Sequence, residues 1–227
     1  MSVADRLRTV NERIVEAAER SGRASESVRL VGVSKGVEPA RVVEAVEAGL
    51  TDVGENRVQE ASEKIPAVNQ SFSVPPRWHL VGHLQSNKAK LAAALFDTID
   101  TVDSLGLAGK LSHVAAASPL PIMLEVQFAP IEGRFGFDPG EVAEIFDEIV
   151  TLPNVTPRGL MTVAPLGLPP DDIRHVFRQL RECRDQIEAA HPSLAPLSLS
   201  MGMSEDFELA IAEGSTEIRI GRAIFGS

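Results

Sequence analysis

The hydrophobic residues of this chain follow two alternating spacings. Over the first twenty residues they recur at helical spacing, which predicts an amphipathic helix that buries Val3, Leu7, Val10, Ile14 and Ala17. Further along, short apolar runs rich in β-branched residues alternate with segments of helical spacing. We predict strands at residues 29–35, 52–55, 77–82, 98–104, 121–128, 157–163, 197–201 and 217–225. We predict the intervening helices at residues 39–46, 58–65, 86–95, 105–117, 139–150, 171–190 and 205–212.

About eight strands in regular alternation with helices favour an α/β fold, a parallel (β/α)8 barrel of the TIM type, over an open doubly wound sheet. No linker or change in composition divides residues 1–227, so we predict a single domain. The sequence stops soon after the eighth strand, and we expect no helix after that strand. The N-terminal helix should fill part of the resulting gap on the outside of the barrel.

Composition and charge argue against several classes of partner. The formal net charge is −10 and the sequence pI is near 5.0, which disfavours a surface for nucleic acid or for an anionic membrane. The first residues lack the apolar core of a signal peptide, and no apolar run is long enough to span a membrane. We therefore expect a cytoplasmic protein.

Lys35 is the most informative residue for chemistry. It ends the first predicted strand, and the C-terminal ends of the strands form the active face of such barrels. A lysine that is partly desolvated there could act as an amine nucleophile toward a carbonyl compound. A lysine that simply extends into water is the alternative interpretation.

Two segments on the same face could bind an anion. Ser200-Met-Gly-Met-Ser204 follows the seventh strand and Gly221-Arg222 lies in the eighth, which are the places where such barrels often bind phosphate. Small residues there let backbone amides approach an anion, and Ser204 could cap the following helix. A turn with a helix cap and no anion is an equally good interpretation.

Arg219 is predicted to point into the barrel, because its neighbours Ile218 and Ile220 must then face the opposite side of the strand. A buried arginine needs a partner. That partner could be a carboxylate such as Glu55 or Glu125, or it could be the ring nitrogen of a bound aromatic cofactor.

We expect no metal site. His79 and His83 have the four-residue spacing of a helical zinc motif, but they fall on a strand end and a turn, and the sequence offers no third ligand. Cys183 is the only cysteine, which excludes a cluster of thiolate ligands and an internal disulfide.

Several motifs occur in a fixed order along nearly the whole chain: Val31-Gly-Val-Ser-Lys35, Gly54-Glu-Asn56, Trp78-His-Leu-Val-Gly-His-Leu-Gln85, Gly159-Leu-Met161, Ser200-Met-Gly-Met-Ser204 and Arg219-Ile-Gly-Arg-Ala-Ile-Phe-Gly226. Each motif is modest alone. Their ordered combination resembles the signatures of the pyridoxal phosphate homeostasis proteins (the YggS/PROSC type).

The resemblance implies a fold-type III, alanine-racemase-like barrel that holds pyridoxal 5′-phosphate (PLP) as an internal aldimine. By position, Lys35 would be the Schiff-base lysine and Arg219 would face the pyridine nitrogen. The phosphate would be surrounded, largely through backbone groups, by Ser200, Met201, Gly202, Gly221 and Arg222. The ring pocket would be lined by Asn56, His79 and Met161.

The chain departs from the family pattern at three places. Arg222 stands where a threonine is common, which removes a hydroxyl from the phosphate site but leaves the backbone N–H. Glu125-Val-Gln127 replaces a typical Gln-Val-Asn, and Arg134 replaces a typical lysine before Gly136. These changes bear on the loop contacts after the fifth strand and leave the aldimine unaffected.

Two observations argue that the chain is not an enzyme. The related racemases take their second acid–base group from a tyrosine, supplied by an additional β domain of the partner subunit, and this chain contains no tyrosine. Arg219 can only donate hydrogen bonds, so it would keep the ring nitrogen of PLP unprotonated and make the cofactor a weaker electron sink.

We therefore favour a PLP-binding homeostasis protein that stores and delivers the cofactor and influences amino-acid and keto-acid balance. It is expected to be a monomer, to release PLP by transimination and to supply PLP-dependent apoenzymes. The alternatives are a slow PLP-dependent amino-acid racemase or other α-carbon enzyme, and a class I aldolase with a catalytic lysine.

Overall fold

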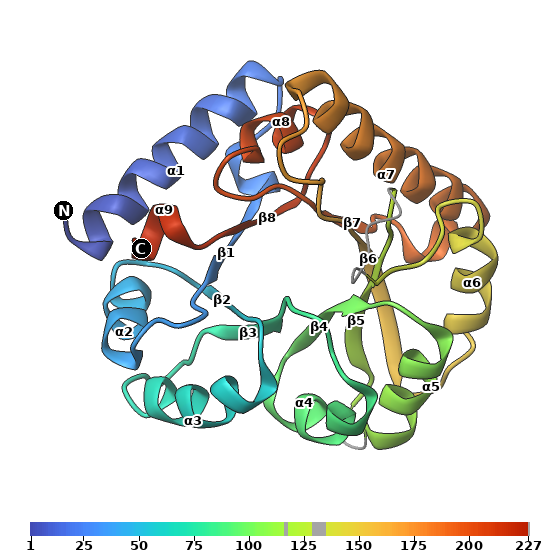
Figure 1. The fold of residues 1–227 in the computed structure, drawn as a ribbon, viewed down its shortest axis with the longest axis horizontal. Coiled ribbons are helices and arrows are strands. Elements are labelled where there is room, and N and C mark those ends of the chain that lie inside the picture. Colours follow the sequence, from blue (N-terminus) through green and yellow to red (C-terminus); the bar gives the residue numbers. More distant parts are fainter. Residues whose placement is uncertain (116–117, 129–134, 227) are drawn as a thin grey trace.

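Eight parallel strands form a closed barrel in the order in which they occur along the chain (Figure 1). The computed structural model describes residues 1–115, 118–128 and 135–226. The strands are β1 (Arg29–Val33), β2 (Asp52–Glu55), β3 (Arg77–Leu80), β4 (Thr98–Val102), β5 (Leu120–Glu125), β6 (Val155–Met161), β7 (Ser198–Ser200) and β8 (Glu217–Ile220). The barrel closes where β1 pairs with β8, with Gly32 opposite Ile220.

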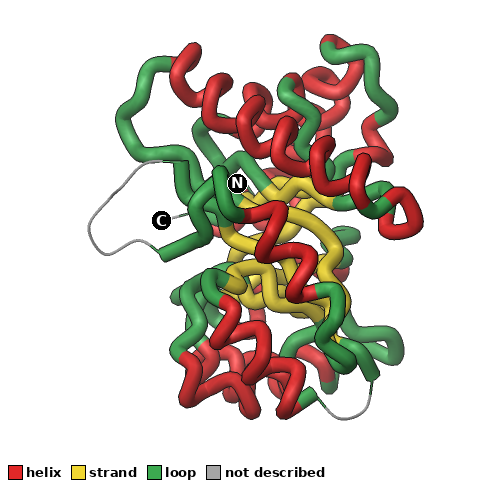
Figure 2. The backbone as a smooth tube through the Cα atoms, turned by 90° about the vertical axis from the view of Figure 1, so that its right-hand side faces the viewer, coloured by secondary structure: helices red, strands yellow, loops and turns green. Residues whose placement is uncertain are grey.

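Helices surround the strands on the outside of the barrel, as Figure 2 shows from the side. They are α1 (Val3–Arg20), α2 (Pro39–Glu47), α3 (Val58–Asn69), α4 (Ala89–Leu95), α5 (Leu105–Val114), α6 (Val142–Ile149), α7 (Pro170–Ala190), α8 (Phe207–Ala212) and α9 (Arg222–Phe225). None of the helices in the described ranges has the length and apolar character needed to cross a membrane.

The N-terminal helix closes the ring of helices, as the sequence predicted. Ser2 caps α1 by accepting a hydrogen bond from the backbone N–H of Asp5, and the Asp5 carboxylate accepts one in return from the N–H of Ser2. The helix buries the predicted residues Val3, Leu7 and Val10 and lies between α8 and α2, against α9 (Figure 1).

One expectation about the end of the barrel was wrong. We expected no helix after the last strand, but β8 ends at Ile220 and Arg222–Phe225 form the short helix α9. The backbone N–H groups of Ile224 and Phe225 donate to the carbonyl of Gly221. This turn buries Ile224 and Phe225 against the core, a packing that an extended strand would not provide.

The two faces of the strands differ in chemistry. Alternate residues such as Ile218 and Ile220 point outward and belong to the hydrophobic core under the helices. Barrel interiors of this type are usually filled by branched apolar residues. Here buried polar side chains contact one another instead, from Asp52, His79, Asp100, Ser200, Glu217 and Arg219.

Candidate functional site

Lys35 lies at the C-terminal end of β1, one residue beyond the last strand pairing. The ladder continues to Ser34, whose backbone N–H donates to the carbonyl of Gly54 at 2.9 Å. Lys35 shares its side of the strand with Val31, which pairs with Arg219. Of the two interpretations, a partly desolvated lysine and one that extends into water, the structure shows the second: Lys35 is exposed, in a turn where the φ of Gly36 is +68°.

The two predicted anion-binding segments come together beside this end of β1. The backbone N–H of Arg219 donates to the carbonyl of Gly202 at 3.0 Å, and the Arg222 side chain pairs with Glu205 at 2.6 Å. A Cβ atom on Gly221 would lie 3.1 Å from the carbonyl oxygen of Val33. The loop after β8 therefore adjoins the end of β1, and the loop after β7 adjoins β8.

Not every amide in these loops is available to an anion. The N–H of Met201 already donates to the carbonyl of Glu217 at 3.0 Å, and that of Met203 donates to Asp206 Oδ1 at 2.6 Å. Burial raises the pKa of Asp206, while the Met203 N–H opposes that rise. Ser204 does not cap α8 as we had suggested, because the helix begins only after Asp206.

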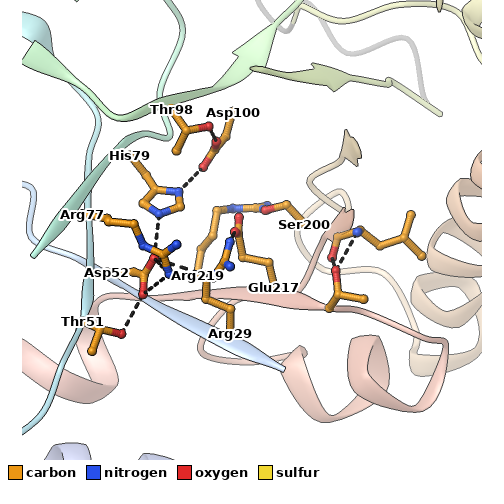
Figure 3. Close-up of polar contacts among 12 residues, drawn as sticks. Arg29, Thr51, Asp52, Arg77, His79, Thr98, Asp100, Ser200, Glu217 and Arg219 are labelled. Carbon is orange, nitrogen blue, oxygen red and sulfur yellow. Dashed lines mark hydrogen bonds and ion pairs between the residues drawn. The ribbon is translucent and has the colours of Figure 1, made fainter. Parts of the chain in front are cut away.

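Arg219 is buried in the barrel interior, as its alternation with isoleucines predicted. Its guanidinium donates to Ser200 Oγ at 2.6 Å and to the carbonyl of Thr162 at 2.8 Å (Figure 3). Burial lowers the pKa of Arg219, and the charges of Glu217, Asp100, Glu125 and Asp206 partly offset this effect. Glu55, one of the two carboxylates suggested as its partner, instead bonds to Ser34 and Lys64.

His79 of β3 bonds to two buried aspartates on the neighbouring strands β2 and β4 (Figure 3). Its Nδ1 lies 2.9 Å from Asp100 Oδ2 and its Nε2 lies 3.1 Å from Asp52 Oδ1. Burial alone would lower the pKa of His79, but the charge of Asp100 and the hydrogen bonds to both aspartates raise it to about 10. His79 is therefore an imidazolium at neutral pH, and both ring nitrogens are already bonded to protein oxygens.

The pKa values of the carboxylates around His79 shift in opposite directions. Burial disfavours the charged form of Asp52, yet the hydrogen bonds from His79 and Thr51 outweigh it and lower its pKa to about 2. Burial and the neighbouring charge of Asp100 raise the pKa of Glu217. Neither Glu217 oxygen has a hydrogen-bond partner in the described part of the chain, although Arg29 lies 3.5 Å from one of them.

One group of potential metal ligands exists among the described residues, and it belongs to this network. His79, Asp100 and Glu217 bring one ligand atom each within 4.8 Å of one another. The hydrogen bonds of His79 and the charge of Arg219 account for the cluster without an ion, because Arg219 supplies a cation next to these acids.

Asn56 and Met161, the other predicted ring-pocket residues, also lie at strand ends. Asn56 Oδ1 is buried and has no hydrogen-bond partner among the residues that the structure describes. Gly82 packs directly against Asn56, since a Cβ atom there would lie 2.4 Å from the Asn56 carbonyl oxygen. Met161 is the buried last residue of β6 and lies between Glu125 and Ser200 in the sheet register.

The loop after β5 carries the remaining departures from the family pattern. The backbone of Phe137 pairs with this loop, because its N–H donates to the Glu125 carbonyl at 2.7 Å and its carbonyl accepts from Gln127 at 3.0 Å. Arg134 lies outside the described residues.

Sequence reasoning missed the residues that hold the backbone around Lys35. These are Ser34, Glu55, Glu60 and Lys64, which form one hydrogen-bonded group. A signal for Lys64 was present in the sequence. It lies in the apolar stripe of α3 together with Ala61, Ile65 and Val68, and a lysine in such a stripe must find a buried partner.

Comparisons with known proteins identify the family. Residues 7–227 match the family described as alanine racemase, N-terminal domain. The chain is 39% identical over 228 residues to the pyridoxal phosphate homeostasis protein of Aquifex aeolicus (strain VF5), covering 100% of this chain and 98% of that relative. The chain belongs to the pyridoxal phosphate homeostasis protein family. The family member from Escherichia coli (strain K12) is 36% identical over 230 residues, covering 99% of this chain and 96% of its own.

Solved structures of relatives share the fold of this family member. The structure of PipY from Synechococcus elongatus PCC7942 with PLP bound has a TM-score of 0.87 and 38% identity, covering 99% of this chain and 100% of that one. An alanine racemase from Clostridium difficile 630 has a TM-score of 0.71 at 16% identity, covering 98% of this chain but 57% of the racemase. The similarity to the alanine racemase shows a shared barrel fold alone.

Proposed function

We propose that this chain binds PLP at the C-terminal end of the barrel, through Lys35, and acts in PLP homeostasis. The observation that carries the proposal is the full-length similarity to PipY, whose structure with PLP bound has the same barrel. The site geometry supports it, since the loop after β8 adjoins the end of β1, just before Lys35, and the loop after β7 adjoins β8. When bound, PLP supplies an aldehyde that condenses reversibly with a lysine amine and releases water.

The donors at this end of the barrel fit a phosphorylated aromatic ligand. The backbone N–H groups of Gly202, Gly221 and Arg222 would face the phosphate, while the exposed Arg222 guanidinium pairs with Glu205. Asn56 Oδ1 is a buried acceptor without a partner in the described residues, so a donor on the ligand would satisfy it.

Residues in the barrel interior would set the electronic character of the bound ring. Arg219 would face the ring nitrogen as a hydrogen-bond donor, held in place by Ser200 and Thr162. His79 cannot bond to the ring nitrogen without losing its hydrogen bond to Asp52 or to Asp100, because both of its own nitrogens are already bonded. His79, Asp52 and Asp100 would therefore support the site from inside the barrel without bonding to the ring nitrogen. Met161 would contribute apolar surface.

We further propose a storage and delivery role without robust catalysis. The chain has no tyrosine to act as a second acid–base group, and a cationic Arg219 would keep the ring nitrogen unprotonated. In this role the protein would be a monomer that supplies PLP-dependent apoenzymes. The names of the relatives, which refer to homeostasis and not to a reaction, support this role.

Incubation of the purified chain with PLP tests the proposal. We expect a yellow protein whose absorbance titrates to one equivalent of PLP, and borohydride reduction should fix one pyridoxyl group on the peptide that contains Lys35. A colourless protein that stays unmodified would refute PLP binding. If the protein rapidly exchanged the α-hydrogen of an amino acid for deuterium in D2O, PLP binding would stand, but the proposed role without catalysis would be wrong.

The Arg219→Gln variant should still attach PLP at Lys35 but should change the absorption spectrum of the bound cofactor. A neutral amide would replace the guanidinium next to the ring nitrogen, and the electron distribution of the ring responds to that change. Arg158→Gln, at an exposed arginine of β6, is the matched control and should leave the spectrum unchanged. An identical spectrum for both variants would mean that Arg219 does not meet the ring.

A further inference from the structure

Lys64 is a buried lysine whose three ammonium N–H groups all have acceptors. It donates to the carbonyl of Ser34 at 2.6 Å, to Glu55 Oε1 at 2.5 Å and to Glu60 Oε1 at 2.8 Å. Only 4% of the residue is exposed. An ammonium group has three donors, so Lys64 is fully satisfied by this chain and has none left for a ligand.

The hydrogen bonds of this group fall on the two peptide groups that flank Lys35. The Ser34 carbonyl, which accepts from Lys64, belongs to the peptide before Lys35. The Gly36 N–H, which belongs to the peptide after it, donates to Glu60 Oε1 at 2.6 Å. Because these two peptide planes determine φ and ψ of Lys35, they also determine the direction of its Cα–Cβ bond.

A further hydrogen bond and the charge of Glu60 strengthen the group. Ser34 Oγ donates to Glu55 Oε1 at 2.6 Å, which ties the end of β1 to the end of β2. Burial disfavours the charged form of Glu60, but the hydrogen bonds from Lys64 and from the Gly36 N–H outweigh it and lower its pKa. Glu60 is therefore a carboxylate at neutral pH and a strong acceptor for both donors.

We propose that Glu60 and Lys64, one turn apart on α3, hold the two peptide groups beside Lys35 and so aim its amine at the PLP site. This role deepens the proposed function and rests on it. Glu60 and Lys64 are positioning residues in this account, since both are bonded to the backbone and to each other. The Lys35 side chain has no hydrogen bond among the described residues, so its direction at the Cα atom depends on the two peptide groups that Glu60 and Lys64 hold.

Two ligands distinguish a change in the orientation of Lys35 from general damage to the binding site. PLP carries the aldehyde that Lys35 attacks, whereas pyridoxine 5′-phosphate has the same ring and phosphate with an alcohol in its place. If the Lys35 amine is wrongly oriented, PLP should attach more slowly, and the affinity for pyridoxine 5′-phosphate should stay unchanged. Damage to the fold or to the loops after β7 and β8 should weaken the binding of both ligands.

We expect Glu60→Ala to lower the rate of PLP attachment, followed by absorbance, about tenfold, because small misplacements of a reacting group cost large factors in rate. Its dissociation constant for pyridoxine 5′-phosphate should stay within about twofold of the unmodified chain. Glu60→Gln keeps an oxygen acceptor for the Gly36 N–H and should recover most of the rate. Glu63→Ala, at an exposed position of the same helix, is the matched control.

Three results would overturn the positioning role: an unchanged attachment rate in Glu60→Ala, a parallel loss of both ligands, or no recovery in Glu60→Gln. If the unmodified chain itself failed to attach PLP, the proposed function would fall, and this role with it. Glu60 is only partly buried, so its variants should fold, and Lys64→Met provides a second, harsher version of the same comparison.

Discussion

Replacing Lys35 with alanine should abolish the borohydride-stable attachment of PLP to the peptide that contains residue 35. The substitution removes the amine that condenses with the aldehyde, so no residual attachment is expected there. Stability should change by less than about 0.5 kcal/mol, because the side chain is exposed and its loss leaves no cavity. Peptide mass analysis after reduction measures the first effect, and thermal unfolding measures the second.

The control for this experiment is Lys110→Ala, which removes an exposed lysine from α5 on the outside of the barrel. It should attach PLP at residue 35 as the unmodified chain does. If Lys35→Ala bound PLP with the same rate and stoichiometry through another lysine, the position of Lys35 would be irrelevant, and the assignment of the site to the end of β1 would be wrong.

The barrel could be predicted from the sequence because strand and helix spacings alternate regularly and each implies a buried face. The bounds of the elements were less accurate. We predicted that the third helix ended at residue 65, just before Pro66, but α3 runs to Asn69 with Pro66 inside it. Proline lacks only its own N–H, and the exposed Pro66 leaves the buried Ile65 and Val68 on one apolar stripe.

The inward direction of Arg219 could be predicted because alternation along a strand is a local property. The partners of buried polar groups could not be predicted in the same way, because they come from distant segments. His79 bonds to Asp52 and Asp100, which lie on the two neighbouring strands and are fixed by register. For the same reason the sequence offered Glu55 as a partner for Arg219, although Glu55 faces α3 and Lys64.

The exposure of Lys35 depends on the turn that follows β1, and strand spacing says nothing about that turn. Gly36 adopts a left-handed conformation with φ of +68°. The Gly36 N–H is also bonded to Glu60, a residue of α3 that the pattern assigned to no site. The predicted site therefore consists of residues that we propose to meet the ligand, while the residues that hold the backbone beside Lys35 emerged only from the packing of α3 on the barrel.

Replacing His79 with glutamine should destabilise the protein by about 3–5 kcal/mol near pH 6, because it removes the buried cation that is bonded to both Asp52 and Asp100. Asp52 keeps its ion pair with Arg77, so the loss falls mainly on Asp100. Only 2% of the histidine is exposed, so water cannot replace it. Urea unfolding of the variant and of the unmodified chain measures the difference. His113→Gln, at an exposed histidine on α5, is the matched control and should be nearly neutral.

This difference should shrink as the pH rises from about 6.5 to about 10. The pKa of His79 is raised to about 10 in the folded chain, above the model-peptide value of 6.5. Its contribution to stability is therefore complete below pH 6.5 and disappears as the imidazolium loses its proton near pH 10. Groups that do not interact with His79 cancel in the comparison, and a gap that stayed constant from pH 6 to pH 10 would show that His79 does not titrate there. In that case the interior of the barrel would not be held together by a buried imidazolium between Asp52 and Asp100.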